Sequence, residues 1–110
     1  MSSLALLRGD LDIALRNRDP VEISTLRTVI AAVENATAVD VETSTQPKLG
    51  LGHDQPRRAL SDEDVTRIIR SERDELVYAA TRYRELGLVE EVVDLERRAR
   101  IVERYLPGST

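Results

Sequence analysis

The stretch DPVEISTLRTVIAAVENA, Asp19–Ala36, predicts the end of one helix and the start of the next. Asp19 is suited to cap the free amides of a helix, Pro20 suits the first helical position, and Glu22 stands three residues after the cap. Apolar residues then recur at three- and four-residue steps, which places them on one helical face: Ile23, Leu26, Val29, Ile30 and Val33. We expect this second helix to stop near Asn35.

Helices are also predicted on both sides of this stretch. Before it, residues 4–18 repeat Leu and Ala on one face. After it, LSDEDV offers Ser61 as a helix cap with Asp64 three residues further on, which is the spacing of a capping box. This third helix is expected to run to Leu86, where Gly87 supplies the left-handed residue that ends many helices.

The fourth predicted helix begins near Leu88 and keeps one apolar face until Pro107 forbids its continuation. Between the second and third helices, residues 36–60 contain two Pro and two Gly and little helical periodicity, which predicts a long irregular loop. The sequence therefore predicts a small all-α fold of about four helices. At 110 residues, the length favours one helical domain over residues 1–110.

The composition requires an aliphatic core and excludes several kinds of site. Phe, Trp and Cys are absent, so Leu, Ile, Val and Ala must supply the buried area, and disulfides and thiolate-bound metals are excluded. The net charge is −4, whereas proteins that bind by neutralising phosphates are normally positive. The first residues lack a basic region and a long apolar run, so we expect no signal peptide and no membrane anchor, and a cytoplasmic protein.

Two charged residues lie close to apolar faces, and both need partners. Glu72 falls within the apolar stripe of the third helix, where an unpaired carboxylate would be expensive to bury. Arg27 flanks the stripe of the second helix and has no acidic residue three or four positions away. Arg27 is suited either to hook a ligand or to act as a polar strut. We favour the strut and predict a partly buried ion pair between Arg27 and Glu72.

A cluster of three arginines, Arg97, Arg100 and Arg104, falls within a narrow arc of the fourth helix. Such a cluster is suited to contact phosphates, which makes it the candidate nucleic-acid site. The alternative is that these arginines are solvated or pair with acids of other helices, and that their place near the carboxyl end of the helix reflects the helix dipole. We favour this structural interpretation.

A second strip of apolar residues is predicted on the first helix. Leu6 and Ile13 point away from its main stripe and lie one above the other across two turns. This strip is suited to self-association or to covering the long loop, and the sequence does not separate these alternatives.

The sequence gives little support for catalysis, and we predict no catalytic residue and no cofactor. His53 is the only histidine, and it lies in the long loop. With one histidine and no cysteine, the chain lacks the cluster expected of a zinc or transition-metal site. The sequence GLG at residues 50–52 has neither the glycine spacing nor the Lys-Ser/Thr of a phosphate-binding loop.

Three motifs occur in an order that resembles the GatB/YqeY family. They are RNRDPVEISTLRTVIAAVENA (16–36), LSDEDV opening a long helix, and YRELGLVEEVVDLERRARIVERYLP (83–107). The most specific pieces are Ser24–Arg27, the turn Tyr83–Gly87, and Tyr105–Pro107. The family includes small stand-alone proteins and the tail domain of the B subunit of the tRNA-dependent amidotransferase. The sequence SERDELVYAA (71–80) replaces the basic run that relatives carry, and the second carboxyl-terminal subdomain of relatives is expected to be absent.

The resemblance implies an all-α module associated with carbon–nitrogen ligases that use glutamine as amide donor, in which the tail helps to hold tRNA. The ligase chemistry belongs to other domains, so we expect no ligase activity from this chain alone. The sequence therefore favours a non-catalytic helical accessory or adaptor module that acts by contact with a protein partner or by self-association. A tRNA-binding helper using the three arginines is the alternative.

Overall fold

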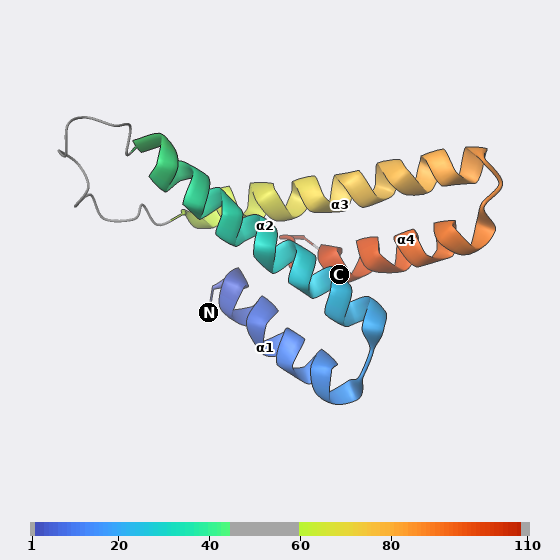
Figure 1. Ribbon diagram of the computed structural model, residues 1–110, viewed down its shortest axis with the longest axis horizontal. Helices are drawn as coiled ribbons and strands as arrows, with labels where there is room; N and C mark the ends of the chain where they lie inside the picture. The colour runs from blue at the N-terminus through green and yellow to red at the C-terminus, as the bar shows by residue number, and fades with distance from the viewer. Residues whose placement is uncertain (1, 45–59, 109–110) are drawn as a thin grey trace.

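The computed structural model describes residues 2–44 and 60–108, with side chains placed for residues 2–36 and 60–108. Within these residues the chain forms four helices and no strand, which confirms the predicted all-α fold (Figure 1). The helices are α1 (Ser3–Asn17), α2 (Pro20–Ser44), α3 (Asp62–Glu85) and α4 (Val89–Glu103).

Helix α2 is longer than its apolar stripe indicates. The predicted end near Asn35 is wrong, because the helix continues to Ser44. Residues 36–44 contain neither Gly nor Pro, so nothing in this part of the sequence stops a helix once it has started. The first part of the segment predicted as an irregular loop is therefore helical. The rest of that segment, with His53 and the GLG sequence, lies outside the described residues.

Side-chain caps hold the starts of α2 and α3, as the sequence predicts. The amide of Glu22 donates to Asp19 Oδ1 at 3.2 Å. At the start of α3, the amide of Asp64 donates to Ser61 Oγ at 3.1 Å and the amide of Ser61 donates to Asp64 Oδ2 at 3.2 Å, which completes the capping box. These backbone bonds are the first cause of the lowered pKa of Asp19 and of Asp64, because they favour the ionised carboxylate.

The turn between α3 and α4 is the one that Gly87 predicts. Gly87 has φ of 75°, in the left-handed region that favours glycine. The amide of Leu88 donates back to the carbonyl oxygen of Tyr83 at 3.0 Å, which reverses the chain directly after α3. Helices α3 and α4 therefore return along each other as an antiparallel hairpin.

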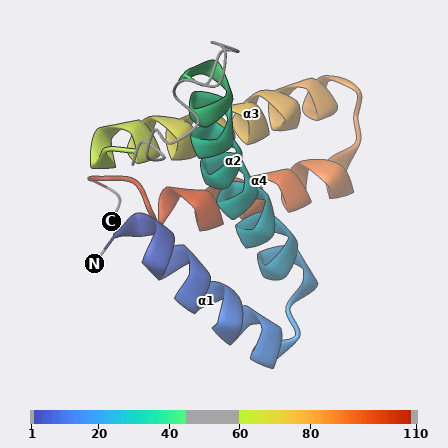
Figure 2. The same ribbon diagram turned by 60° about the vertical axis from the view of Figure 1, so that its left-hand side comes forward.

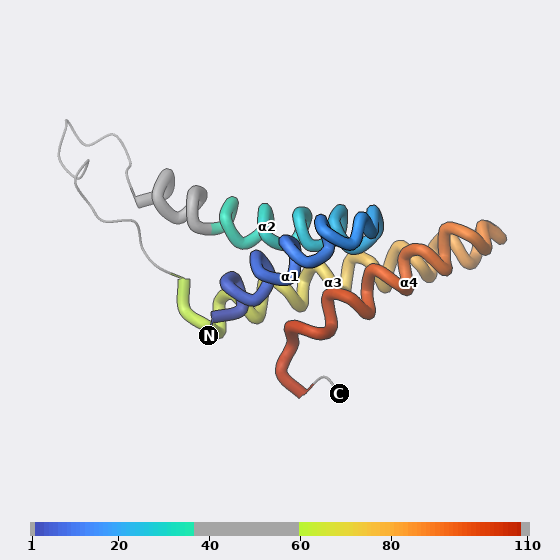
Figure 3. Tube along the Cα trace, turned by 90° about the horizontal axis from the view of Figure 1, so that it is seen from below, coloured from blue at the N-terminus to red at the C-terminus, as the bar shows by residue number. Residues whose placement is uncertain are grey.

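The four helices form two hairpins that cross. Helices α1 and α2 pack against each other in one layer, and α2 crosses both helices of the α3–α4 hairpin (Figures 1 and 2). Seen from below, the turn between α3 and α4 extends past the turn between α1 and α2 (Figure 3). Only part of the α3–α4 hairpin is thus covered by the other layer.

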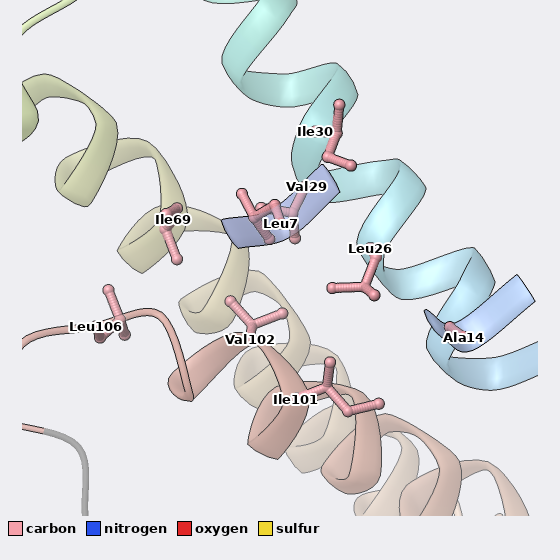
Figure 4. Close-up of a cluster of buried hydrophobic side chains, with 9 residues drawn as sticks. All are labelled: Leu7, Ala14, Leu26, Val29, Ile30, Ile69, Ile101, Val102 and Leu106. Carbon is pink, nitrogen blue, oxygen red and sulfur yellow. The ribbon is translucent and has the colours of Figure 1, made fainter. Parts of the chain in front are cut away.

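The core lies at the crossing. Side chains from all four helices converge there, and all are aliphatic, as the composition requires (Figure 4). The central cluster consists of Leu7, Ala14, Leu26, Val29, Ile30, Ile69, Ile101, Val102 and Leu106. Toward the turn between α3 and α4 burial stops, and residues 81–91 are all exposed.

Candidate functional site

The predicted ion pair between Arg27 and Glu72 does not form. Arg27 is exposed, and none of the ion pairs or hydrogen bonds among the residues with placed side chains involves it. On α2, Arg27 lies roughly 110° around the helix from the centre of the buried stripe, so its side chain leaves on the far side from α3. The prediction is wrong because flanking a stripe is not the same as facing the neighbouring helix.

Arg98, which the sequence analysis did not single out, joins α4 to α2. Its Nε donates to Asp94 Oδ2 at 2.8 Å, and a terminal nitrogen donates to Ser24 Oγ at 3.0 Å and to Thr25 Oγ1 at 3.4 Å. Thr25 is buried, and its hydroxyl donates to the carbonyl oxygen of Val21 at 2.7 Å, which leaves its lone pairs free to accept from Arg98. Arg98 therefore satisfies the buried polar group of α2.

Two of the three clustered arginines of α4 also pair with α2. Arg97 lies 2.7 Å from Asp19 Oδ2, and Arg104 lies 2.8 Å from Glu22 Oε1. The Arg97 guanidinium contributes, after the backbone bond, to the lowered pKa of Asp19. Arg100 is exposed, and no ion pair in the described part of the chain involves it. The cluster thus holds the start of α2 against α4, and Arg100 is its member without an ion pair among the described residues.

A cavity of about 280 Å³ opens where α2, α3 and α4 meet. Its floor is apolar, with Val29, Leu76 and Val102, and the hydroxyl-bearing Thr25 and Thr28 lie on the α2 side. The charged lining consists of Glu72, Glu75 and Arg98. Burial, and then the neighbouring Glu75, raise the pKa of the Glu72 carboxyl. The cavity therefore holds a carboxylate that has no ion-pair partner among the described residues.

A second hollow of about 260 Å³ continues from this cavity along the hairpin. It is lined by Tyr83, Glu90, Glu91, Asp94 and Leu95. The ion pair between Arg98 and Asp94 joins the two hollows, because each partner lines one of them. We call the two hollows together the acidic groove. It is lined by five carboxylates and one guanidinium, and among the described residues Asp94 alone of the five carboxylates forms an ion pair.

Large aliphatic side chains are exposed on the other side of the hairpin end. Leu86, Val89 and Val93 have exposed fractions of 68%, 69% and 59%. We call these three residues the apolar tip. A hollow of about 380 Å³ beside it is lined partly by Val89 and Val93 and is crossed by an ion pair of 2.8 Å between Arg84 and Glu96. The predicted strip of Leu6 and Ile13 on α1 is also exposed.

The motif residues behind the family resemblance have structural contacts. The hydroxyl oxygens of Ser24 and Thr25 accept hydrogen bonds from Arg98, and Leu26 is fully buried. The Tyr105 hydroxyl donates to Asp10 Oδ2, and burial together with this bond raises the pKa of Tyr105. Comparison of the chain with protein families, curated proteins and solved structures finds no match.

Two further kinds of site are absent among the described residues: a metal-binding cluster and a membrane-spanning helix. Within residues 2–36 and 60–108, no group of three His, Cys, Asp or Glu side chains is placed to hold a metal ion. Likewise, no described helix combines the length and apolar character needed to cross a bilayer. What the fold presents to solvent is an acidic groove, an apolar tip and exposed Arg100.

Proposed function

We propose that this chain is a non-catalytic helical accessory or adaptor module, of the kind that the GatB/YqeY resemblance implies, and that it acts by protein contact. The observation that carries the proposal is the apolar tip. Leu86 directly follows α3, Val89 and Val93 are one turn apart on α4, and all three are mostly exposed. They belong to the end of the hairpin, which extends past the other described helices (Figures 1 and 3). Clustered exposed apolar side chains are typical of surfaces that contact another protein.

The layout of the fold supports this role. The crossing of the helices supplies the stability, and the hairpin end makes little contribution to the core because residues 81–91 are exposed. Large aliphatic residues in such a position are not needed for packing within the chain. A contact with a partner protein or with a second copy gives them a function.

The double variant Val89→Ser/Val93→Ser tests the proposal, with Leu6→Ser/Ile13→Ser as a control that removes another exposed apolar pair, from α1. Sedimentation velocity measures self-association, and chemical crosslinking with mass spectrometry measures contacts with other proteins. We expect the first variant to lose the contacts of the wild type and the second to keep them. Contacts that survive in the tip variant, or a wild-type protein that makes none, would refute the proposal.

Binding of tRNA through Arg97, Arg100 and Arg104 is the alternative function. It has weaker support, because two of these arginines are already paired with Asp19 and Glu22 and the net charge is −4. A salt titration of tRNA binding tests it: steep loss of affinity with salt, with a flatter slope in Arg100→Ala, supports tRNA binding. Absence of binding at low salt removes this alternative.

A further inference from the structure

The acidic groove continues a surface that the protein already uses to bind a helix. On α4, Val102 and Arg98 contact the α2 side, and Asp94, Leu95 and Glu91 follow at three- and four-residue steps. On α3, Leu76 lines the hollow beside α2, and Tyr83 lines the next hollow two turns further along. Helix α2 therefore covers the first half of one continuous face, and the second half has no cover among the described residues.

The two halves of this face differ in charge. Next to α2, the guanidinium of Arg98 is matched by Asp94 and by the two hydroxyls of Ser24 and Thr25. Glu72 and Glu75 also line the hollow beside α2, whereas the further hollow has Glu90 and Glu91 and no guanidinium in its lining. None of these four carboxylates has an ion pair within the described part of the chain. Carboxylates gathered over an apolar floor favour a cationic partner, because opposite charge relieves their mutual repulsion.

From this geometry we infer that the acidic groove binds an amphipathic basic helix of a partner protein, which lies beside α2 with its apolar side on Leu76, Tyr83 and Leu95 and its Lys or Arg side chains among the carboxylates. Helices that bind in grooves use apolar anchors at helical spacing together with complementary charge at the edges. The inference goes beyond the proposed contact at the apolar tip. It concerns a different surface and is tested separately.

A labelled synthetic peptide tests the inference with the full chain. The probe has about 18 residues of Lys, Leu and Ala with one apolar and one basic face, which is ~27 Å long as a helix. A second peptide of the same composition is shuffled so that it has no apolar face. Fluorescence anisotropy at low and physiological salt gives the affinities. We expect the amphipathic peptide to bind at least about tenfold more tightly than the shuffled one, because only the first can bury an apolar face.

Matched variants locate the site. Glu75→Gln/Glu91→Gln removes two exposed groove carboxylates, and Asp12→Asn/Glu63→Gln removes two exposed carboxylates elsewhere with the same change in net charge. We expect about tenfold weaker binding in the groove variant and less than about twofold change in the control. Because the four side chains are exposed and form no ion pair in the described part of the chain, both variants should fold, which circular dichroism checks.

Chemical-shift mapping on the wild type gives an independent result. Amide shifts on adding the peptide should concentrate at Leu76, Tyr83 and Leu95. Equal weakening in both double variants would mean attraction by net charge alone and would overturn the inference. So would equal binding of the two peptides, loss of binding in Val89→Ser/Val93→Ser with the groove variant unaffected, or a wild-type dimer that Glu75→Gln/Glu91→Gln dissociates.

Discussion

The two ends of the α3–α4 hairpin are made of similar helix yet behave differently. At the crossing, Ile69 of α3 and Ile101 and Val102 of α4 are almost completely buried under α1 and α2. At the other end, Val89 and Val93 of the same α4 are mostly exposed. The difference therefore comes from the covering layer and not from the hairpin's own sequence. The covered end of the hairpin packs in the core and stabilises the fold, and the exposed end is available for contacts.

The same substitution at a covered and an uncovered position gives the largest expected contrast. Leu26→Ala removes a side chain that is 1% exposed and should lower the free energy of unfolding by about 2–5 kcal/mol, because it leaves a cavity in the core. Leu86→Ala removes a side chain that is 68% exposed and should change the free energy of unfolding by less than about 0.5 kcal/mol. Urea denaturation followed by circular dichroism measures both. Similar losses at the two sites would show that the hairpin end is packed.

Arg98 is one of the arginines that link the covering layer to the hairpin, and the loss of stability on removing it should be the next largest. Arg98→Ala removes the charge-assisted hydrogen bonds from α4 to the hydroxyls of Ser24 and Thr25 and should destabilise the protein by about 1–3 kcal/mol. Arg100→Ala on the same helix removes an exposed arginine and should change the free energy of unfolding by less than about 0.5 kcal/mol. Thermal denaturation of the two variants compares them. Equal melting temperatures would contradict the role of Arg98.

The cap of α3 tests whether the start of the hairpin depends on local chemistry as well as on packing. Ser61→Ala removes the oxygen that accepts from the Asp64 amide and should lower stability by about 1 kcal/mol. Ser61→Asp should retain most of the stability, since an Asp carboxylate also caps well. Ser71→Ala, an exposed position within the same helix, is the control and should be neutral or slightly stabilising. A loss in Ser71→Ala equal to that in Ser61→Ala would contradict the cap.

Glu72 gives the smallest expected effect, and its sign depends on pH. Because burial and the neighbouring Glu75 raise the pKa of Glu72 above its ordinary value of 4.5 in the folded protein, the folded state holds the proton more tightly and stability falls as pH rises through the folded pKa. Glu72→Gln should therefore stabilise the protein at pH 7, by less than about 1 kcal/mol since solvent screens a half-buried carboxyl. Below pH 4.5 the gain should disappear. Denaturation of both proteins at a series of pH values measures the difference in stability. A loss of stability in Glu72→Gln at pH 7 would mean that Glu72 has a cationic partner.

The fold was largely predictable because its signals are local. Ser61, Asp64, Asp19 and Gly87 act on residues within a few positions, so the sequence around each is enough to predict the cap or turn. The end of α2 was not predictable from its apolar stripe, because a helix can continue past its buried face when no breaking residue follows.

The candidate site was less predictable because its contacts are distant in sequence. Arg98 reaches Ser24 and Thr25 across separations of 74 and 73 residues, and only the packing of α4 on α2 brings them together. The prediction of an Arg27–Glu72 ion pair used the position of each residue on its own helix. The side of α2 on which α3 packs could not be read from the sequence. A signal for Arg98 existed in Asp94, four residues before it, which supports an ion pair along one face of α4.

The arginine contacts from α4 to the start of α2 bear on the order in which the protein folds. Arg97, Arg98 and Arg104 join residues that are 78, 74 and 82 positions away, so a very large loop must close before any of them can form. We expect these contacts to form after the helical hairpins and after the rate-limiting barrier. Arg98→Ala should accordingly speed unfolding in stopped-flow experiments and leave the refolding rate nearly unchanged. A slowed refolding rate would place the arginine in the nucleus instead.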